Sequence, residues 1–272
     1  MDDGSNPEWM LTTRPLAANA RVAYAPGDFH FGDLYLPAKK GPHPVVVAIH
    51  GGFWRAEYDL THLGHACAAL AKLGYAVWSL EYRRLGNPGG GYPGTLEDVA
   101  RGTDFLRELA PKHGLDLTHV VSLGHSAGGH LALWLAARHK LPSPSPLHRR
   151  SPLALRGVVA LAAVSDLARG AQLHLSNDVV QQLMGGEEKA KGPEYAFASP
   201  AALLPLGVAQ RLVHGTRDDI VPFAMSAAYA TRAQALMDPV QLIPVPHGSH
   251  FDVINPRNED AWKLVVTALQ SL

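Results

Sequence analysis

One stretch of the chain decides its fold: residues 119–139 read HVVSLGHSAGGHLALWLAARH. A β-branched strand leads into a turn of small residues, and an amphipathic helix leads out of it. The five residues from Gly124 to Gly128 match the Gly-x-Ser-x-Gly pattern of a nucleophile elbow, in which a tight turn holds a strained serine between a strand and a helix. The stretch therefore predicts a reactive hydroxyl at Ser126. The alternative is a glycine-rich turn in which the serine is incidental.

Strands and helices alternate on both sides of this turn. The sequence predicts strands at 21–24 and 29–36 (a hairpin), 45–49, 75–82, 119–123, 155–164, 211–214 and 240–245. It predicts helices at 58–73, from residue 95, at 128–139, 179–184 and 223–236, and from residue 259. This alternation is typical of an α/β fold with a mostly parallel, doubly wound sheet that helices cover on both faces. Sites in such sheets lie beyond the carboxyl ends of the strands.

The domain organisation follows from where this alternation holds. We expect a single domain over residues 21–272, preceded by an N-terminal extension over residues 1–20. Residues 167–199 interrupt the rhythm, and we interpret them as an insertion over the sheet edge that forms a small cap. The apolar residues 9–11 (Trp-Met-Leu) are interpreted as a candidate lid over the pocket.

Composition excludes several classes of protein. The 24 Lys and Arg residues balance the 24 Asp and Glu residues, so the chain lacks the basic character of a nucleic-acid binder or an anionic-membrane binder. No apolar run approaches the ~20 residues of a membrane helix, and the N-terminus lacks a secretory signal, so we expect a cytoplasmic protein without membrane insertion. The single cysteine, Cys67, excludes an intramolecular disulfide and a cysteine-based zinc cluster. The oligomeric state stays open.

A second glycine turn follows the strand 45–49 and reads His50-Gly51-Gly52-Phe53-Trp54. Acyl transfer requires preorganised N–H groups that stabilise the negative charge growing on the carbonyl oxygen. We expect the backbone N–H groups of Gly52 and Phe53, and that of Ala127 directly after the serine, to act as these donors. A plain glycine turn beside a buried Trp54 is the alternative.

A serine nucleophile needs a base, and the base needs an orienting carboxylate. In this class of fold the acid and then the histidine follow the serine along the chain. Adjacent Asp218 and Asp219 follow the strand 211–214, and we favour Asp218 as the acid. Two histidines follow the next strand. We prefer His250 to His247 as the base, because an intervening glycine lets the loop turn back toward the elbow.

Together these motifs resemble an α/β-hydrolase esterase or lipase over nearly the whole chain from about residue 20. Hormone-sensitive-lipase-like esterases usually carry a third glycine and an acidic residue where this chain has Phe53 and His125. The His-Gly-Gly-x-Trp form is more similar to kynurenine formamidase and related small esterases, as is the aromatic-acidic pair that follows His250.

The resemblance implies an enzyme with no metal or organic cofactor and a triad of Ser126, Asp218 and His250. We expect hydrolysis of a small-molecule carboxylic ester, short-chain or aryl, through an acyl-enzyme. The same machinery acting on an aryl formamide such as N-formylkynurenine is the alternative. A non-catalytic binding protein on a hydrolase scaffold is the alternative from another class. His62 and His65 are interpreted as covered surface histidines, not as metal ligands.

Overall fold

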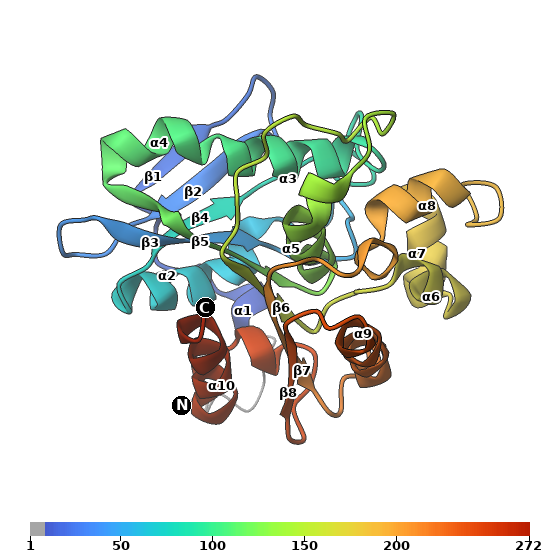
Figure 1. Cartoon of the computed structure of the whole chain (residues 1–272). Helices are drawn as coiled ribbons and strands as arrows, with labels where there is room; N and C mark the ends of the chain where they lie inside the picture. Colours follow the sequence, from blue (N-terminus) through green and yellow to red (C-terminus); the bar gives the residue numbers. More distant parts are fainter. Residues whose placement is uncertain (1–8) are drawn as a thin grey trace.

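A twisted sheet of eight strands runs through the computed structural model, which describes residues 9–272 (Figure 1). The strands lie in the order β1-β2-β4-β3-β5-β6-β7-β8, and β2 alone runs antiparallel to both of its neighbours, whereas the other pairs are parallel. Their bounds are β1 Ala20–Ala23, β2 Phe31–Tyr35, β3 His43–Ile49, β4 Ala76–Leu80, β5 Leu115–His125, β6 Gly157–Leu161, β7 Ala209–Gly215 and β8 Val240–Val245. The predicted α/β class with a mostly parallel sheet is confirmed.

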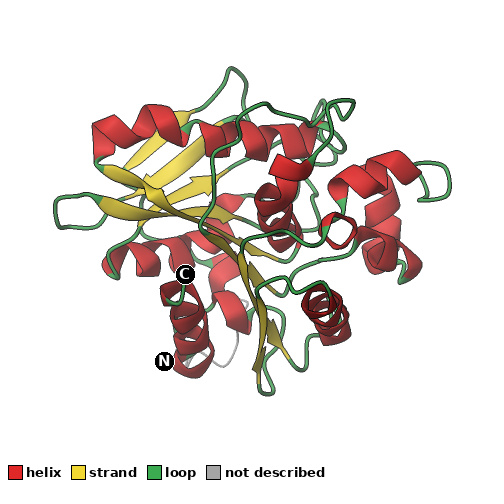
Figure 2. Cartoon of the chain, viewed as in Figure 1, coloured by secondary structure: helices red, strands yellow, loops and turns green. Residues whose placement is uncertain are grey.

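Helices cover both faces of the sheet (Figure 2). They are α1 Trp9–Thr12, α2 Gly64–Lys72, α3 Gly94–Asp104, α4 Leu106–His113, α5 Ala127–Ala137, α6 Leu167–Gln172, α7 Leu175–Met184, α8 Gly192–Ala198, α9 Phe223–Ala235 and α10 Glu259–Gln270. Within residues 9–272, none of these helices is both long and apolar enough to cross a bilayer.

Two apolar clusters hold these layers together, one against each face. Alternate residues of a strand point to opposite faces, and β3 shows this directly. Val45 and Val47 pack with α3, α5 and α9, whereas Val46 and Ala48 pack with α1, α2 and α10. Because both faces are buried, the central strands are continuously apolar, which is why the sequence shows short β-branched runs instead of alternation.

The register of the central strands positions the two glycine turns. β3 and β5 pair in parallel with Ile49 opposite Gly124, so the turns that follow these strands leave the sheet side by side. The approach is close enough to require glycine. A Cβ on Gly124 would lie 2.0 Å from the carbonyl oxygen of Gly128, and a Cβ on Gly128 would lie 2.1 Å from that of Ile49. Ser126 occupies the strained conformation expected of an elbow, with φ 56° and ψ −119°.

The insertion differs from its prediction. One helix was expected in 167–199, whereas the structure has three: α6, α7 and α8. Left-handed backbone at His174 and from Ser176 to Asp178 separates α6 from the regular part of α7, and this interrupts the helical periodicity that sequence analysis depends on. The three helices lie to one side of the sheet, beyond α5 and α9 (Figure 1).

The close approach at the elbow predicts a large effect of one methyl group. We expect Gly124→Ala to lower the thermal unfolding midpoint by about 5 °C or more, since overpacking that must displace backbone costs about 2 kcal/mol. Gly192→Ala is the matched control, because a Cβ there meets nothing within 4 Å. Equal midpoints for the two variants in differential scanning calorimetry would contradict this account of the elbow.

Candidate active site

The loops after three parallel strands converge at the carboxyl edge of the sheet. Ser126 follows β5, Asp218 follows β7, and His250 follows β8. Ser126 and His250 line one cavity of ≈ 240 Å³, together with Gly52 and Phe53 from the turn after β3. Ser126 and His250 are nearly buried, at 2% and 3% exposure, so a reaction here takes place largely away from bulk water.

Asp218 and His250 form a hydrogen-bonded pair, with 2.7 Å between Asp218 Oδ2 and His250 Nδ1. A carboxylate accepts only, so the imidazole donates from Nδ1. The other ring nitrogen, Nε2, is then unprotonated in the neutral ring and can take a proton from a hydroxyl. The opposite carboxylate oxygen accepts from the backbone N–H groups of Ile220 and Val221, which fixes the plane of the carboxylate.

The surroundings keep Asp218 ionised. Burial alone would raise the pKa of its carboxyl. Hydrogen bonds from His214 and His250, and the backbone N–H of Val221, outweigh burial and hold the pKa of Asp218 below its usual value. Asp219, the other candidate acid, is exposed to solvent. Of the two adjacent carboxylates, Asp218 is therefore the one in contact with a histidine at the cavity.

His214 is a partner of Asp218 that sequence analysis did not single out. Its Nε2 lies 3.0 Å from Asp218 Oδ2 and 2.9 Å from the carbonyl oxygen of Val221, so it carries a proton. Its Nδ1 is then free to accept from the hydroxyl of Ser226, 2.8 Å away. The one sequence signal for His214 is its position near the end of β7, directly before the loop that carries Asp218.

The two candidate bases have different environments. His247 is exposed and has left-handed backbone with φ 61°, and its N–H donates to the hydroxyl of Thr216. His250 is held from behind by His125, whose Nε2 lies 2.9 Å from the His250 carbonyl oxygen. Burial and the neighbouring His250 and His62 rings keep the pKa of His125 well below its usual value, so His125 donates this bond as a neutral ring.

The turn after β3 presents free N–H groups beside the serine. Gly52 has φ 103° and Phe53 has φ 52°, both in the left-handed region. Within residues 9–272, the N–H groups of Gly52, Phe53 and Ala127 make none of the backbone hydrogen bonds of the turns, loops and caps. A Cβ on Gly51 would lie 3.0 Å from Ser126 Cβ and 2.8 Å from the His125 carbonyl oxygen, so a larger residue there would separate the turn from the elbow.

A buried ionic cluster holds that turn in place. The Nδ1 atom of His50 lies 2.8 Å from the Gly51 carbonyl oxygen, and its Nε2 atom lies 3.1 Å from Glu81 Oε1. Burial raises the pKa of Glu81, but the adjoining His50 and Arg84 lower it by more than burial raises it. The net effect lowers the pKa of Glu81, so the carboxyl is ionised. Because the Gly51 carbonyl is tied to His50, the N–H of Gly52 in the same trans peptide points the opposite way.

Two further side chains near this turn, Trp54 and His62, are buried. Trp54 is fully buried, and its ring contacts that of His130 edge-on, with 5.3 Å between the ring centroids. His62 lines the cavity with Ser126. Its interpretation as a surface histidine was wrong, because the 3-10 helix Leu60–Leu63 turns it inward. Burial lowers the pKa of His62 to about 3, so the ring is neutral at pH 7.

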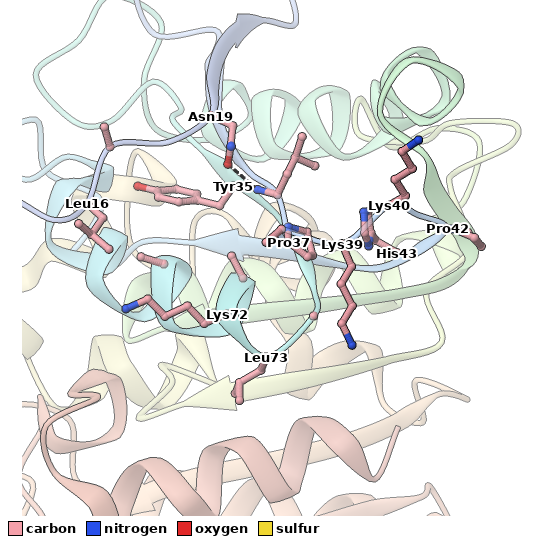
Figure 3. Close-up of a pocket in the computed structure, with 16 residues that line it drawn as sticks. Leu16, Asn19, Tyr35, Pro37, Lys39, Lys40, Pro42, His43, Lys72 and Leu73 are labelled. Carbon is pink, nitrogen blue, oxygen red and sulfur yellow. Dashed lines mark hydrogen bonds between the residues drawn. The ribbon is translucent and has the colours of Figure 1, made fainter.

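A larger cavity, ≈ 660 Å³, lies at the opposite edge of the sheet (Figure 3). It is lined by the end of β2, the start of β3 and the end of α2. Figure 3 shows Lys39, Lys40 and Lys72 at its rim pointing away from one another, so these cations do not converge on a common point. The chemistry-bearing residues gather instead at the smaller cavity. Residues 9–272 include no group of three His, Cys, Asp or Glu side chains arranged to hold a metal ion.

The sheet order, the strained serine after β5 and the loops after β7 and β8 define an α/β-hydrolase. Comparison with protein families is more specific. The sequence model of the BD-FAE family matches residues 32–232, and the chain belongs to this family.

Relatives and solved structures agree with this assignment. Esterase LipQ of Mycobacterium tuberculosis is 25% identical over 215 residues, which cover 77% of this chain and 51% of LipQ. Kynurenine formamidase avaC of Aspergillus versicolor is 30% identical over 206 residues, 65% of this chain and 69% of avaC. Esterase B of Lactobacillus rhamnosis has the same fold, with a TM-score of 0.79 and 21% identity over 97% of this chain and 90% of that chain. The chain spans about half the length of several curated relatives, 51%, 48% and 55% for three of them.

The environment of Asp218 predicts the pH dependence of stability. A carboxyl with a lowered pKa contributes stability above its unfolded pKa, near 3.9, and that stability is lost as pH falls through the folded pKa. We expect the urea midpoint of the wild type to fall steeply below about pH 4 and that of Asp218→Asn to fall less steeply. Asp219→Asn, which changes the exposed neighbour, should keep the wild-type slope. Parallel curves for the two variants would contradict the role given to Asp218.

Proposed function

We propose that the protein hydrolyses carboxylic esters as a serine hydrolase, with Ser126, Asp218 and His250 as its triad. The observation that carries the proposal is the hydrogen bond between Asp218 and the ring of His250, at a cavity that Ser126 also lines. The free N–H groups of Gly52, Phe53 and Ala127 support the same conclusion, because they provide the donors that a tetrahedral oxyanion needs.

The acylation step follows from these groups. Ser126 Oγ attacks the carbonyl carbon of the ester while its proton passes to Nε2 of His250. The charge on the carbonyl oxygen is bound by the backbone N–H groups, and Asp218 stabilises the imidazolium. When the intermediate collapses, the bond to the alcohol oxygen breaks and the imidazolium returns the proton to that oxygen. Water then attacks the acyl-enzyme by the same route, releasing the acid and restoring the hydroxyl.

The comparisons support an ester as the substrate. Several relatives are named esterases, among them LipQ and LipC of Mycobacterium tuberculosis. The apolar lining of the cavity, with Phe53, Ile220 and Phe251, is compatible with a small uncharged ester.

An aryl formamide is the second candidate substrate. It is favoured by the similarity to kynurenine formamidase avaC, which is 30% identical and of which this chain covers 69%. Its hydrolysis passes through the same kind of tetrahedral oxyanion, so the same residues would serve. The difference between the two candidates lies in the group that fits the cavity, not in the triad.

The triad is tested by matched substitutions. We expect Ser126→Ala and His250→Ala each to lower kcat for p-nitrophenyl butyrate by about 10⁴-fold or more with the fold intact. His247→Ala is the control, since this exposed histidine does not line the cavity, and it should retain wild-type kcat. A Ser126→Ala variant that keeps its activity, with its circular dichroism unchanged, would remove Ser126 from the mechanism.

A substrate panel separates the two candidates. We expect higher kcat/KM for short-chain and phenyl esters than for N-formylkynurenine, because most relatives are named esterases. The measurement is initial rates for acetate, butyrate and phenyl esters beside N-formylkynurenine at equal enzyme concentration. A kcat/KM for N-formylkynurenine above that for every ester would favour the formamidase instead.

A further inference from the structure

Among the described residues of the N-terminal segment, Leu11 reaches the cavity that Ser126 and His250 line. Leu11, in the short helix α1, lines this cavity. The remaining large apolar and aromatic lining residues come from the loops after the strands and are Phe53, Tyr58, Ile220 and Phe251. Leu11 is 43% exposed, whereas its neighbours Trp9 and Met10 are buried at 9% and 1% exposure. Residues 1–8 of the predicted N-terminal extension lie outside the described residues.

The helix α1 is anchored to the loop that follows His250. The indole N–H of Trp9 donates to Asn255 Oδ1 at 3.2 Å. The guanidinium of Arg257 lies 3.7 Å from the centre of the Trp9 ring, within the range of a cation–π contact. Met10 packs in the core cluster with the helices of this face. These contacts connect α1 to the chain segment that carries His250.

The same helix is also anchored to the segment that carries His62. The rings of Trp9 and His65 meet edge-on with 4.4 Å between centroids. The hydroxyl of Thr13 lies 3.2 Å from His65 Nε2. α1 also contacts the 3-10 helix Leu60–Leu63, which includes His62. These contacts with two separate segments fix the helix, so Leu11 is held at the cavity as part of a wall.

We propose that Leu11 sets the size of the apolar substrate group that the cavity accepts. The proposal rests on the proposed ester hydrolysis and deepens it by naming the substrate class: esters whose apolar group is short. The cavity is small, at ≈ 240 Å³, and Leu11 forms part of its wall. A long apolar chain that enters the cavity must therefore pass along its lining side chains, Leu11 among them. The other walls belong to the loops that carry the proposed catalytic groups, whereas Leu11 does not.

Changing Leu11 should therefore change chain-length preference without changing the chemistry. Leu11→Ala removes three carbons from the wall and makes room for a longer chain, and each methylene accommodated in an apolar pocket is worth about tenfold in kcat/KM. Leu11→Trp fills the same space and should shorten the preferred chain. Opposite shifts from the two substitutions separate a role in size selection from general damage to the fold, which would lower activity toward all esters.

The test measures kcat/KM for p-nitrophenyl acetate, butyrate, hexanoate and octanoate. We expect Leu11→Ala to raise the octanoate-to-acetate ratio by about tenfold and Leu11→Trp to lower it. Leu16→Ala is the matched control. Leu16 is also an exposed leucine of the N-terminal segment, at 61%, but it lines the remote cavity of Figure 3. The Leu16→Ala variant should keep the octanoate-to-acetate ratio of the wild type.

Two contrary outcomes are distinguishable. If the wild type is active and both Leu11 variants keep its octanoate-to-acetate ratio, the proposal for Leu11 is overturned while the proposed ester hydrolysis stands. If the wild type hydrolyses none of the four esters, the proposed function fails and the proposal for Leu11 fails with it.

Discussion

The structure depends on the close approach of two backbone turns at the ends of β3 and β5. Glycine at 124 and 128 lets the elbow fold against the carbonyl oxygen of Ile49, and glycine at 51 lets the neighbouring turn reach Ser126. Each of these contacts is too short for a Cβ. The hydroxyl and the free N–H groups of Gly52 and Phe53 are thereby brought to one cavity by the sheet itself, without the need for a mobile element.

A second constraint is the fixed orientation of the His250 ring. Asp218 binds its Nδ1, while His125 binds its backbone carbonyl from the far side. Asp218 is itself held by His214 and by the N–H groups of its own loop. His125 and His214 contact His250 and Asp218, and we expect them to act through this proposed base and acid. Burial favours the neutral ring of His125. The hydrogen bond from His214 Nε2 to the carbonyl oxygen of Val221 fixes the position of the proton on the His214 ring.

Local patterns explain how much could be predicted from the sequence. The β-branched runs and helical spacings predicted the alternation of strands and helices, and the pentapeptide around Ser126 predicted the turn that the structure contains. The roles of His62 and His125 could not be predicted, because they arise from contacts between distant segments, such as His125 with the carbonyl of residue 250. The helices α6 and α8 were missed because they are only six and seven residues long, and left-handed backbone separates α6 from the regular part of α7.

The most direct test of the account is covalent trapping of the nucleophile. A p-nitrophenyl alkylphosphonate loses nitrophenolate as a P–O bond forms with an activated hydroxyl, and peptide mass spectrometry then locates the adduct. We expect one adduct, on Ser126 of the wild-type protein, and its loss in His250→Ala, which lacks the proposed base. An adduct on a different residue, or unchanged labelling of Ser126 in His250→Ala, would contradict it.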